Sequence, residues 1–250
     1  MSPWYEETFG RDYLALYPHR DNAEARRDIE RIVSLIDPQR DRPLLDLGCG
    51  PGRHLVALHE AGFTRLTGLD LSQELLDVAR ERLDAAGCTE AELVRADMRE
   101  IPFRERFATV LSMFTSFGYF PSEEDDQTML RGVFAALAPG GVLVLDTLHR
   151  GATIAGLVPE EKRTIGGHHV HIRRSITPDG KRVEKTTQLV MPGEPDRVYR
   201  ESVRMYSGDD LRALAAGAGF SDIALYGTLD GSAFGPTAPR SVIVARRPDR

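Results

Sequence analysis

The sequence predicts an α/β fold in which a mostly parallel sheet carries helices on both faces and a small antiparallel insertion interrupts the pattern. The first observation is that short apolar runs alternate with helical spacing up to residue 147. Strands that alternate with helices form a parallel sheet with helices on both faces. The second observation is that the period falls to nearly two between residues 168 and 206, after which a helix and two strands follow.

The first part of the chain contains the parallel strands and the helices that connect them. Apolar spacing predicts a helix over 22–36, which ends before Pro38. Ser72 and Gly87 are of the residue types that begin and end a helix, and Pro139-Gly140-Gly141 ends a later one. The predicted strands are 44–47, 65–70, 91–95, 108–113 and 142–147, and the helices between them are 53–61, 72–86 and 123–137.

The second part begins with alternating polar and apolar residues. HVHIRRSI, RVEKTTQLVM and RVYRESVRMY are separated by two turn sequences, Pro178-Asp179-Gly180 and Pro192-Gly193-Glu194-Pro195. We therefore expect a three-stranded antiparallel insertion. A helix over 207–218 follows, and strands over 223–226 and 241–245 complete the large sheet.

The composition is that of an ordinary globular protein and excludes several classes. The 250 residues are 41% hydrophobic and 28% charged, which suits one large domain, with or without a sizeable insertion. The net charge of −6 argues against a nucleic-acid partner, whose binding depends on positive charge. Two cysteines make no disulfide framework, and neither a signal-peptide core nor a membrane-length apolar stretch is evident. We therefore expect a cytoplasmic protein without a membrane partner.

A glycine-rich turn after the first strand carries the strongest functional information. Leu44 to Leu55 read LLDLGCGPGRHL, with glycines at alternate positions directly after the strand. Glycine lets the backbone approach a ligand because no Cβ intervenes. The spacing differs from the dinucleotide motif G-x-G-x-x-G, and no Lys-Ser/Thr pair follows as in a P-loop. The acid before the turn, Asp46, would repel a pyrophosphate but suits an ammonium or sulfonium group.

Three segments resemble one family in order and spacing. Asp46-Leu-Gly-Cys-Gly-Pro-Gly52 resembles motif I of the class I methyltransferases that use S-adenosylmethionine (SAM). Leu66-Thr-Gly-Leu-Asp-Leu-Ser72 resembles the second strand of that family, and Val94-Arg-Ala-Asp-Met98 the segment after its third strand. The resemblance covers residues 41–147. It implies a Rossmann-like, seven-stranded, mostly parallel sheet and SAM as the cofactor.

The resemblance also implies how the methionyl group and the ribose of SAM are held. The backbone at Gly48 and Gly50 would pass close to the methionyl group. Asp46 would lie near its ammonium, directly or through water. Asp70, at the end of the second strand, would accept hydrogen bonds from the two ribose hydroxyls.

The adenine would be held by residues after the second and third strands. In the family pattern Leu71 and Met98 sandwich the ring, and Asp97 accepts a hydrogen bond from its exocyclic amine. Ala96 completes the expected contacts. Each of these residues follows the carboxyl end of a strand, the edge at which open α/β sheets bind ligands.

The segment after the fourth strand, residues 110–120, indicates the class of methyl acceptor. Nucleic-acid amino methyltransferases carry Asn/Asp-Pro-Pro-aromatic at this place, and VLSMFTSFGYF lacks it. The run instead resembles small-molecule N- and O-methyltransferases, including sugar N-methyltransferases. Met113 would lie beside the methionyl part through its backbone. Phe114, Phe117 and Tyr119 would wall the acceptor pocket, or the two phenylalanines would fill the core.

The amino-terminal segment is rich in aromatic residues and has two interpretations. By analogy with related folds, a helix bearing Tyr13, Tyr17, His19 and Arg20 folds over the cofactor as a lid. Tyr13 and Arg20 would then contact the cofactor, with Arg20 paired to its carboxylate, and Tyr17 would face the sulfonium or the acceptor. The alternative is an amphipathic helix packed on the edge of the sheet.

A general base is needed only if the acceptor is an alcohol, a phenol or an amine that arrives protonated. The candidate residues for catalytic contact with the acceptor are Tyr17, His19, Tyr119 and His149. His149 follows the fifth strand and is equally a solvated loop residue. His169 and His171 share one face of a strand, but no cysteine or carboxylate pair accompanies them at ligand spacing, so we expect no metal site.

The favoured function is transfer of a methyl group from SAM to N or O of a small molecule by in-line displacement. The alternatives are a NAD-dependent Rossmann oxidoreductase, against which the glycine spacing counts, and a non-catalytic SAM-binding protein. The expected parts are an N-terminal helical lid (1–40), the SAM-binding core (41–160), the antiparallel insertion (161–206) and a C-terminal helix with the last two strands (207–250). Because the insertion can cover the pocket or build a dimer contact, a homodimer stays open.

Overall fold

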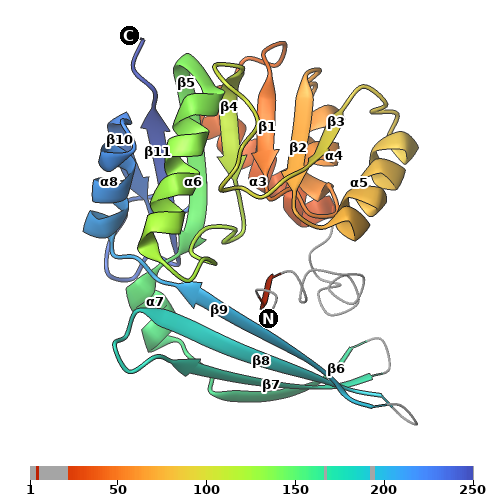
Figure 1. The fold of residues 1–250 in the computed structure, drawn as a ribbon, viewed down its shortest axis with the longest axis vertical. Helices are drawn as coiled ribbons and strands as arrows, with labels where there is room; N and C mark the ends of the chain where they lie inside the picture. Colours follow the sequence, from red (N-terminus) through yellow and green to blue (C-terminus); the bar gives the residue numbers. More distant parts are fainter. Residues whose placement is uncertain (1–3, 6–21, 166–167, 192–194, 250) are drawn as a thin grey trace.

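The computed structural model describes residues 4–5, 22–165, 168–191 and 195–249, which form two separate sheets (Figure 1). A seven-stranded sheet with helices on both faces makes up the larger part of the molecule, and a four-stranded sheet lies beyond one end of its strands. The predicted α/β fold with an antiparallel insertion is therefore confirmed.

The large sheet has the strand order β10-β11-β5-β4-β1-β2-β3. β11 runs antiparallel to β5 and β10, and the remaining pairs are parallel. The chain moves outward from β1 to β3 and then crosses to β4 on the other side of β1, which creates a switch point where such sheets bind ligands. The strands are β1 (Leu44–Leu47), β2 (Leu66–Asp70), β3 (Glu92–Arg95), β4 (Phe107–Ser112), β5 (Leu137–Leu148), β10 (Ser221–Tyr226) and β11 (Arg240–Arg246).

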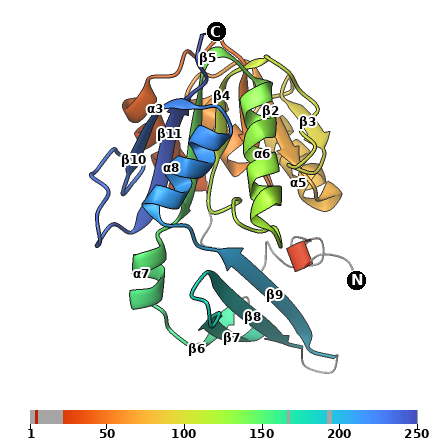
Figure 2. The same cartoon turned by 60° about the vertical axis from the view of Figure 1, so that its left-hand side comes forward.

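Two groups of helices cover the two faces of this sheet (Figures 1 and 2). Successive residues of a strand point to opposite faces. Leu44 accordingly packs in the cluster formed with α3, α4 and α5, and Leu45 packs in the cluster formed with α6 and α8. These helices are α3 (Asn22–Ile36), α4 (Arg53–Glu60), α5 (Gln73–Ala85), α6 (Glu123–Ala136) and α8 (Gly208–Gly217). None of the described helices combines the length and apolar character needed to cross a bilayer.

Local sequence explains where the helices begin. Ser72 Oγ accepts a hydrogen bond from the backbone N–H of Leu75, and Ser207 forms a capping box with Asp210. Pro139-Gly140-Gly141 was expected between a helix and a strand. It lies instead inside β5, whose pairing with β4 is irregular at this point.

The insertion is a four-stranded antiparallel sheet, so the prediction of three strands was wrong by one. The missed strand, β6, reads EEKRTI and has no apolar alternation that would reveal it. It forms because the edge of β7 offers it a hydrogen-bonding partner. The strands are β6 (Glu160–Ile165), β7 (His168–Ile176), β8 (Arg182–Val190) and β9 (Arg197–Arg204).

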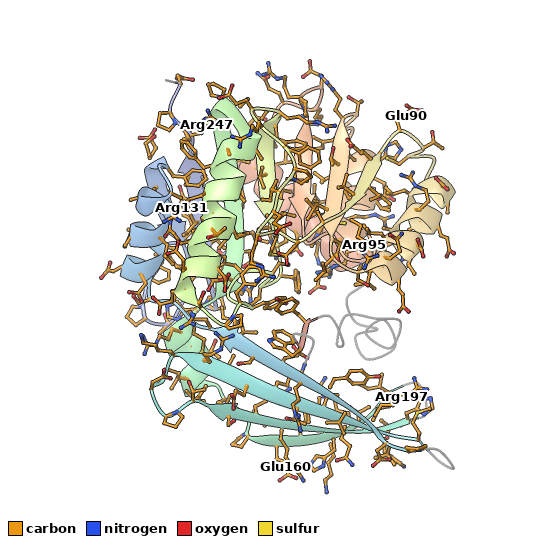
Figure 3. The ribbon with its side chains drawn as sticks, in the orientation of Figure 1. Glu90, Arg95, Arg131, Glu160, Arg197 and Arg247 are labelled. Atoms are coloured by element: carbon orange, nitrogen blue, oxygen red, sulfur yellow. The ribbon has the colours of Figure 1, made fainter. Side chains whose placement is uncertain are left out.

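The insertion leaves the core after β5 and returns to it at α8 (Figure 2). A short helix that the sequence did not predict, α7 (Arg150–Ala155), leads from β5 toward β6. Arg95, at the carboxyl end of β3, marks the edge of the large sheet that faces the insertion (Figure 3). The carboxyl ends of the parallel strands and the insertion therefore border the same part of the molecule.

Candidate active site

A cavity of about 630 Å³ opens at the carboxyl ends of β1 to β4, on the edge marked by Arg95 in Figure 3. This is the edge with the switch point between β1 and β4. Its wall comes from the turns after these strands, the start of α5 and Tyr5. Among the residues expected to hold the cofactor, the wall contains Gly48, Gly50, Asp70, Leu71, Ala96, Asp97, Met98 and Met113.

The glycine turn presents backbone to this cavity. Gly48 and Gly50 have φ angles of +75° and +52°, in the left-handed region that glycine adopts freely. A Cβ on Gly48 would lie 2.8 Å from Ser116 Oγ, whereas a Cβ on Gly50 would meet no protein atom within 4 Å. Gly52 serves helix packing instead, because a Cβ there would lie 2.9 Å from the Cβ of Ala79 on α5. The open side of Gly50 therefore leaves room for a ligand to approach the backbone of the turn.

Asp70 ties the glycine turn to the following helix. Its Oδ2 accepts a hydrogen bond from the backbone N–H of Gly50 at 2.8 Å, and its Oδ1 accepts one from Ser72 at 2.9 Å. Burial raises the pKa of Asp70, and these two backbone donors limit the rise. Each carboxylate oxygen still has a lone pair for a further donor. The carboxylate is thus fixed at the cavity wall and able to accept two ligand hydroxyls.

Asp46 lies beneath the turn and is not part of the cavity wall. The residue is only 1% exposed, and its Oδ2 has no hydrogen-bond partner in the described part of the chain. Burial raises the pKa of Asp46 to about 6, while the nearby His54 and Arg53 oppose the rise. A buried carboxylate oxygen without a donor is costly. A cationic group above the turn would reduce that cost, directly or through water.

The first two residues of α4, Arg53 and His54, also line the cavity, although they were not among the predicted site residues. Arg53 pairs with Glu24 at 2.7 Å, and its guanidinium lies 4.0 Å from the ring centroid of Phe114. His54 is buried, with its Nε2 3.6 Å from Oδ2 of Asp28. The pair of Arg53 with Glu24 fastens α3 to the helix that follows the glycine turn. The sequence signal was two polar side chains at the start of a helix, directly before the apolar run Leu55–Leu58.

The other end of the cavity is lined by Leu71, Ala96 and Met98, with Asp97 beside them. Arg99 engages Asp97 through its backbone N–H at 2.8 Å and through its guanidinium at 2.7 Å. Burial raises the pKa of Asp97, but the bonds and charge of Arg99 outweigh it and hold that pKa below its usual value. The carboxylate is therefore ionised at neutral pH and can accept a bond from a ligand amine.

The segment after β4 has an unusual backbone. Phe114 and Thr115 have φ angles of +57° and +68°, a region that residues with side chains adopt uncommonly. Asp146 on β5 accepts a hydrogen bond from the backbone N–H of Phe114 at 3.1 Å. Arg240 on β11 in turn donates to both oxygens of Asp146, at 2.7 and 2.8 Å. These contacts hold the strained turn that directs Phe114 to the cavity wall.

Comparisons with known proteins agree with this geometry. Residues 44–141 match the model of a methyltransferase domain. The chain is 30% identical over 196 residues to dTDP-3-amino-3,4,6-trideoxy-alpha-D-glucopyranose N,N-dimethyltransferase of Streptomyces venezuelae, covering 76% of this chain and 78% of that enzyme. The chain belongs to the class I SAM-dependent methyltransferases. Several other curated relatives of this methyltransferase are matched over about half of their length, among them a dTDP-3-amino-3,6-dideoxy-alpha-D-glucopyranose N,N-dimethyltransferase of Streptomyces fradiae.

Solved structures extend the similarity to almost the whole methyltransferase. A SAM-dependent methyltransferase from Clostridium acetobutylicum superposes with a TM-score of 0.80 at 18% identity and covers 97% of this chain and 98% of its own, which shows the shared fold. A SAM-bound amino pentose methyltransferase from Micromonospora echinaspora has a TM-score of 0.68 at 26% identity, over 95% and 97% of the two chains.

SAM is the cofactor of this methyltransferase, and the cavity fits it. The open side of Gly50 suits the close approach of a methionyl group, and the unsatisfied oxygen of Asp46 beneath it suits an ammonium. Asp70 has acceptor capacity for a ribose, and the apolar wall at Leu71 and Met98 suits a flat ring. The individual contacts of these residues with SAM stay predictions.

The residues proposed to contact the methyl acceptor differ in whether they lie on the cavity wall. Tyr119 lines the cavity, and Phe117 is fully buried in the core, which settles the two options left for that ring. His149 is not on the cavity wall: its Nδ1 accepts a hydrogen bond from the backbone N–H of Ala152 at 2.9 Å and caps α7. Its catalytic role stays a prediction without support from the cavity. The residues of the predicted lid, Tyr13, Tyr17, His19 and Arg20, lie outside the described residues.

The histidines of β7 have ordinary partners. His171 pairs with Glu160 on the neighbouring strand, and His169 Nδ1 lies 3.4 Å from the hydroxyl of Thr164. Across the ranges that the structure describes, no three His, Cys, Asp or Glu side chains gather as metal ligands would. Family membership sets aside the NAD-dependent and non-catalytic alternatives.

Proposed function

We propose that this methyltransferase acts on the amino nitrogen of a deoxyamino sugar carried by a nucleoside diphosphate. The observation that carries the proposal is the 30% identity, over about three quarters of both chains, to an enzyme named for N,N-dimethylation of such a sugar. The relative from Streptomyces fradiae is named for a similar acceptor, and the SAM-bound structural neighbour for an amino pentose. The cavity volume of about 630 Å³ falls in the range of small-molecule sites, roughly 300–1,000 Å³.

The chemistry of an amine acceptor suits this cavity wall. When bound, SAM supplies a methyl group on a positively charged sulfur, so a neutral amine nitrogen needs alignment more than activation. Phe114 and Tyr119 line one side of the cavity, where the ring of Tyr119 can attract a cationic group, while the ring of Phe114 already carries the guanidinium of Arg53 at 4.0 Å. The phenol oxygen of Tyr119 can accept a hydrogen bond from the amine N–H of the sugar. This bond would orient the lone pair of the amine nitrogen.

A matched set of acceptors tests the proposal. The purified enzyme is incubated with SAM and with nucleoside-diphosphate sugars that carry either an amino or a hydroxyl group at the same ring position. We expect S-adenosylhomocysteine to be released with the amino sugars and a mass gain of one or two methyl groups on the product. Turnover confined to the hydroxyl sugars, or to acceptors without a sugar, would overturn it.

We also infer that nucleic acid is not the acceptor and that the enzyme works in the cytoplasm. Because the sheet of the insertion can build a contact with a second copy, we infer as a third point that the enzyme can form a homodimer. The net charge of −6 supports the first inference, because phosphate binding needs positive charge. Two buried free thiols, Cys49 and Cys88, support the second. Methyl incorporation into oligonucleotides would contradict the first, localisation of a tagged chain outside the cytoplasm the second, and a monomer mass in sedimentation the third.

A further inference from the structure

Two arginines of the insertion hold a loop of the cavity wall by its backbone. The loop is residues 118–121, between β4 and α6, and we call it the wall loop. Arg182, at the start of β8, donates to the carbonyl oxygens of Gly118, Tyr119 and Phe120 at 3.3, 3.3 and 3.0 Å. Arg204, at the end of β9, donates to the carbonyl oxygen of Pro121 at 2.7 Å. Each carbonyl of the wall loop therefore has an arginine partner.

This arrangement supplies hydrogen-bond donors to the carbonyl groups of the loop backbone. The wall loop belongs to neither a helix nor a strand, so its carbonyls need partners from elsewhere when water is excluded. A guanidinium suits the task because it offers five donors in one rigid plane. Arg182 is also fixed on β9. Its Nε donates to Ser202 Oγ at 2.9 Å, and its Nη2, which the loop carbonyls share, donates to the carbonyl oxygen of Ser202 at 2.7 Å.

A second set of contacts holds the same loop from the core. Asp126 on α6 is fully buried, and its two oxygens accept from the backbone N–H of Gly118 at 3.2 Å and from the hydroxyl of Tyr206 at 2.7 Å. Gly118 has a φ of +93°, and a Cβ there would lie 2.6 Å from the carbonyl oxygen of Arg204. Figure 2 shows β9 passing beneath the end of α6 where these contacts meet. The loop is thus pressed closely against β9.

The side chains of the wall loop connect this anchorage to the site. Tyr119 and Phe120 line the cavity. The ring of Trp4 lies 5.1 Å from the ring of Tyr119, and the ring of Tyr5 lies 5.8 Å from that of Phe120. A movement of the loop backbone would therefore change the acceptor side of the cavity and the surroundings of Trp4, while the glycine turn lies on other strands.

We propose that Arg182 is a positioning residue for the methyl acceptor. By holding the carbonyl oxygens of the wall loop, Arg182 fixes Tyr119 and Phe120 in position relative to the insertion sheet. The proposal rests on the proposed function in that the acceptor is a small molecule bound beside this wall. The insertion thereby sets which acceptors fit, without itself contributing the aromatic wall.

The test compares Arg182→Ala and Arg182→Lys with Arg173→Ala, an exposed arginine on β7 of the same sheet. Arg182→Ala should raise the KM for the amino-sugar acceptor about tenfold, because the wall is no longer held, while kcat and the Kd for SAM change by about twofold or less. Lysine should restore only part of the effect, since one ammonium cannot serve three carbonyls. Arg173→Ala should match the wild type.

A fluorescence measurement makes the test independent of the acceptor. The chain has a single tryptophan, Trp4, so its emission reports on the ring of Tyr119 beside it. Arg182→Ala should shift this emission and speed hydrogen exchange at residues 118–120, with S-adenosylhomocysteine bound throughout. If no amino sugar is methylated but these shifts appear, the proposed function fails and the positioning role stands.

Unchanged emission, exchange and acceptor KM in Arg182→Ala would overturn the proposal. A parallel loss of SAM affinity and acceptor affinity would also overturn it, because that pattern indicates general destabilisation. Should Arg182→Ala fail to fold, Ser202→Ala removes only the anchor of Arg182 Nε and should give the same shifts at smaller size. Wild-type values in that variant would count against the proposal.

Discussion

The two sides of the cavity are built from contacts of very different range. On the side proposed for the cofactor, formed by the turns after β1, β2 and β3, Asp70 reaches Gly50 and Ser72, which are 20 and 2 residues away. On the side proposed for the acceptor, formed by residues 114–120 after β4, Arg182 reaches Phe120 from 62 residues away and Arg240 reaches Asp146 from 94. The cofactor side is thus a property of successive strand–helix units, and the acceptor side a property of the assembled fold. Mutations on the two sides should separate cofactor affinity from stability and acceptor binding.

The largest effect should follow from Asp70→Ala on the cofactor side. The variant loses up to two charge-assisted bonds to the cofactor ribose, which we expect to cost about 3 kcal/mol, on the order of a hundredfold in the Kd for SAM. Titration calorimetry measures it. Asp77→Ala, an exposed carboxylate on the following helix, is the matched control and should bind as the wild type does. Equal affinity in a folded Asp70→Ala variant would refute the cofactor assignment.

On the acceptor side, Arg240→Ala should act on stability first. It leaves the buried Asp146 without its bidentate partner and releases the strained turn at Phe114. Because the Arg240 side chain is 29% exposed, we expect a loss of about 2 kcal/mol in the free energy of unfolding, less than for a fully buried pair. Urea denaturation measures the change. Arg212→Ala breaks an exposed pair on α8 and should cost about 0.5 kcal/mol or less. Equal losses in the two variants would contradict the role of this pair.

Each side of the cavity has a buried aspartate whose pKa is raised to about 6. The pH dependence of SAM binding should distinguish the roles of these two aspartates. Burial is the main cause for both Asp46 and Asp126. If Asp46 must be ionised to attract the ammonium, affinity for SAM should be full above pH 6 and fall by up to about tenfold per pH unit below it. Asp46→Asn should bind weakly and flatten this profile, whereas Asp126→Asn should keep it.

Linkage gives the opposite sign for stability without cofactor. A carboxyl whose folded pKa lies above its unfolded value stabilises the fold when protonated, and this contribution is lost as pH rises through about 6. The shift in melting temperature caused by SAM should therefore grow between pH 5 and pH 7 in the wild type. A shift independent of pH would contradict the role of Asp46.

The smallest effects should come from two helix caps, one on each side. Ser72 and Ser122 each accept a hydrogen bond from the third residue of the helix that follows, so replacement by alanine should cost about 1 kcal/mol of unfolding free energy in either case. The functional consequences should differ, since Ser72→Ala loosens the turn at Asp70 and Ser122→Ala the helix that follows the wall loop. Calorimetry with SAM and acceptor KM values distinguish them. Identical SAM affinities and identical acceptor KM values in the two variants would contradict the separation of the two sides.

The cofactor side was predictable because its information is local. A strand, a glycine turn and a helix start follow one another in LLDLGCGPGRHL, and Asp70 ends the next strand along the chain. The spacing of apolar residues likewise located the strands of the large sheet. Arg53 and His54 escaped notice because their partners, on α3, are about thirty residues upstream and carry no motif.

The acceptor side was less predictable for a physical reason. Phe114 and Phe117 stand three residues apart in one aromatic run, and only the left-handed turn at Phe114 sends one to the cavity and leaves the other in the core. The contacts of Arg182 are made to carbonyl oxygens, which leave no trace in the sequence of the loop. β6 was missed because a polar strand is recognised by its neighbour and not by its own pattern.

The grip of Arg182 and Arg204 on main-chain oxygens has a consequence for how this enzyme can change. Every amino acid carries the same carbonyl, so the side chains at positions 119 and 120 can be exchanged while the arginines keep their partners. Gly118, with its left-handed backbone, is barred from such exchange, and Phe120 is constrained because its ring is buried in the core. The position of the wall backbone and the chemistry of the wall side chains can therefore change independently. A library randomised at residue 119 alone would explore new acceptors within an unchanged frame.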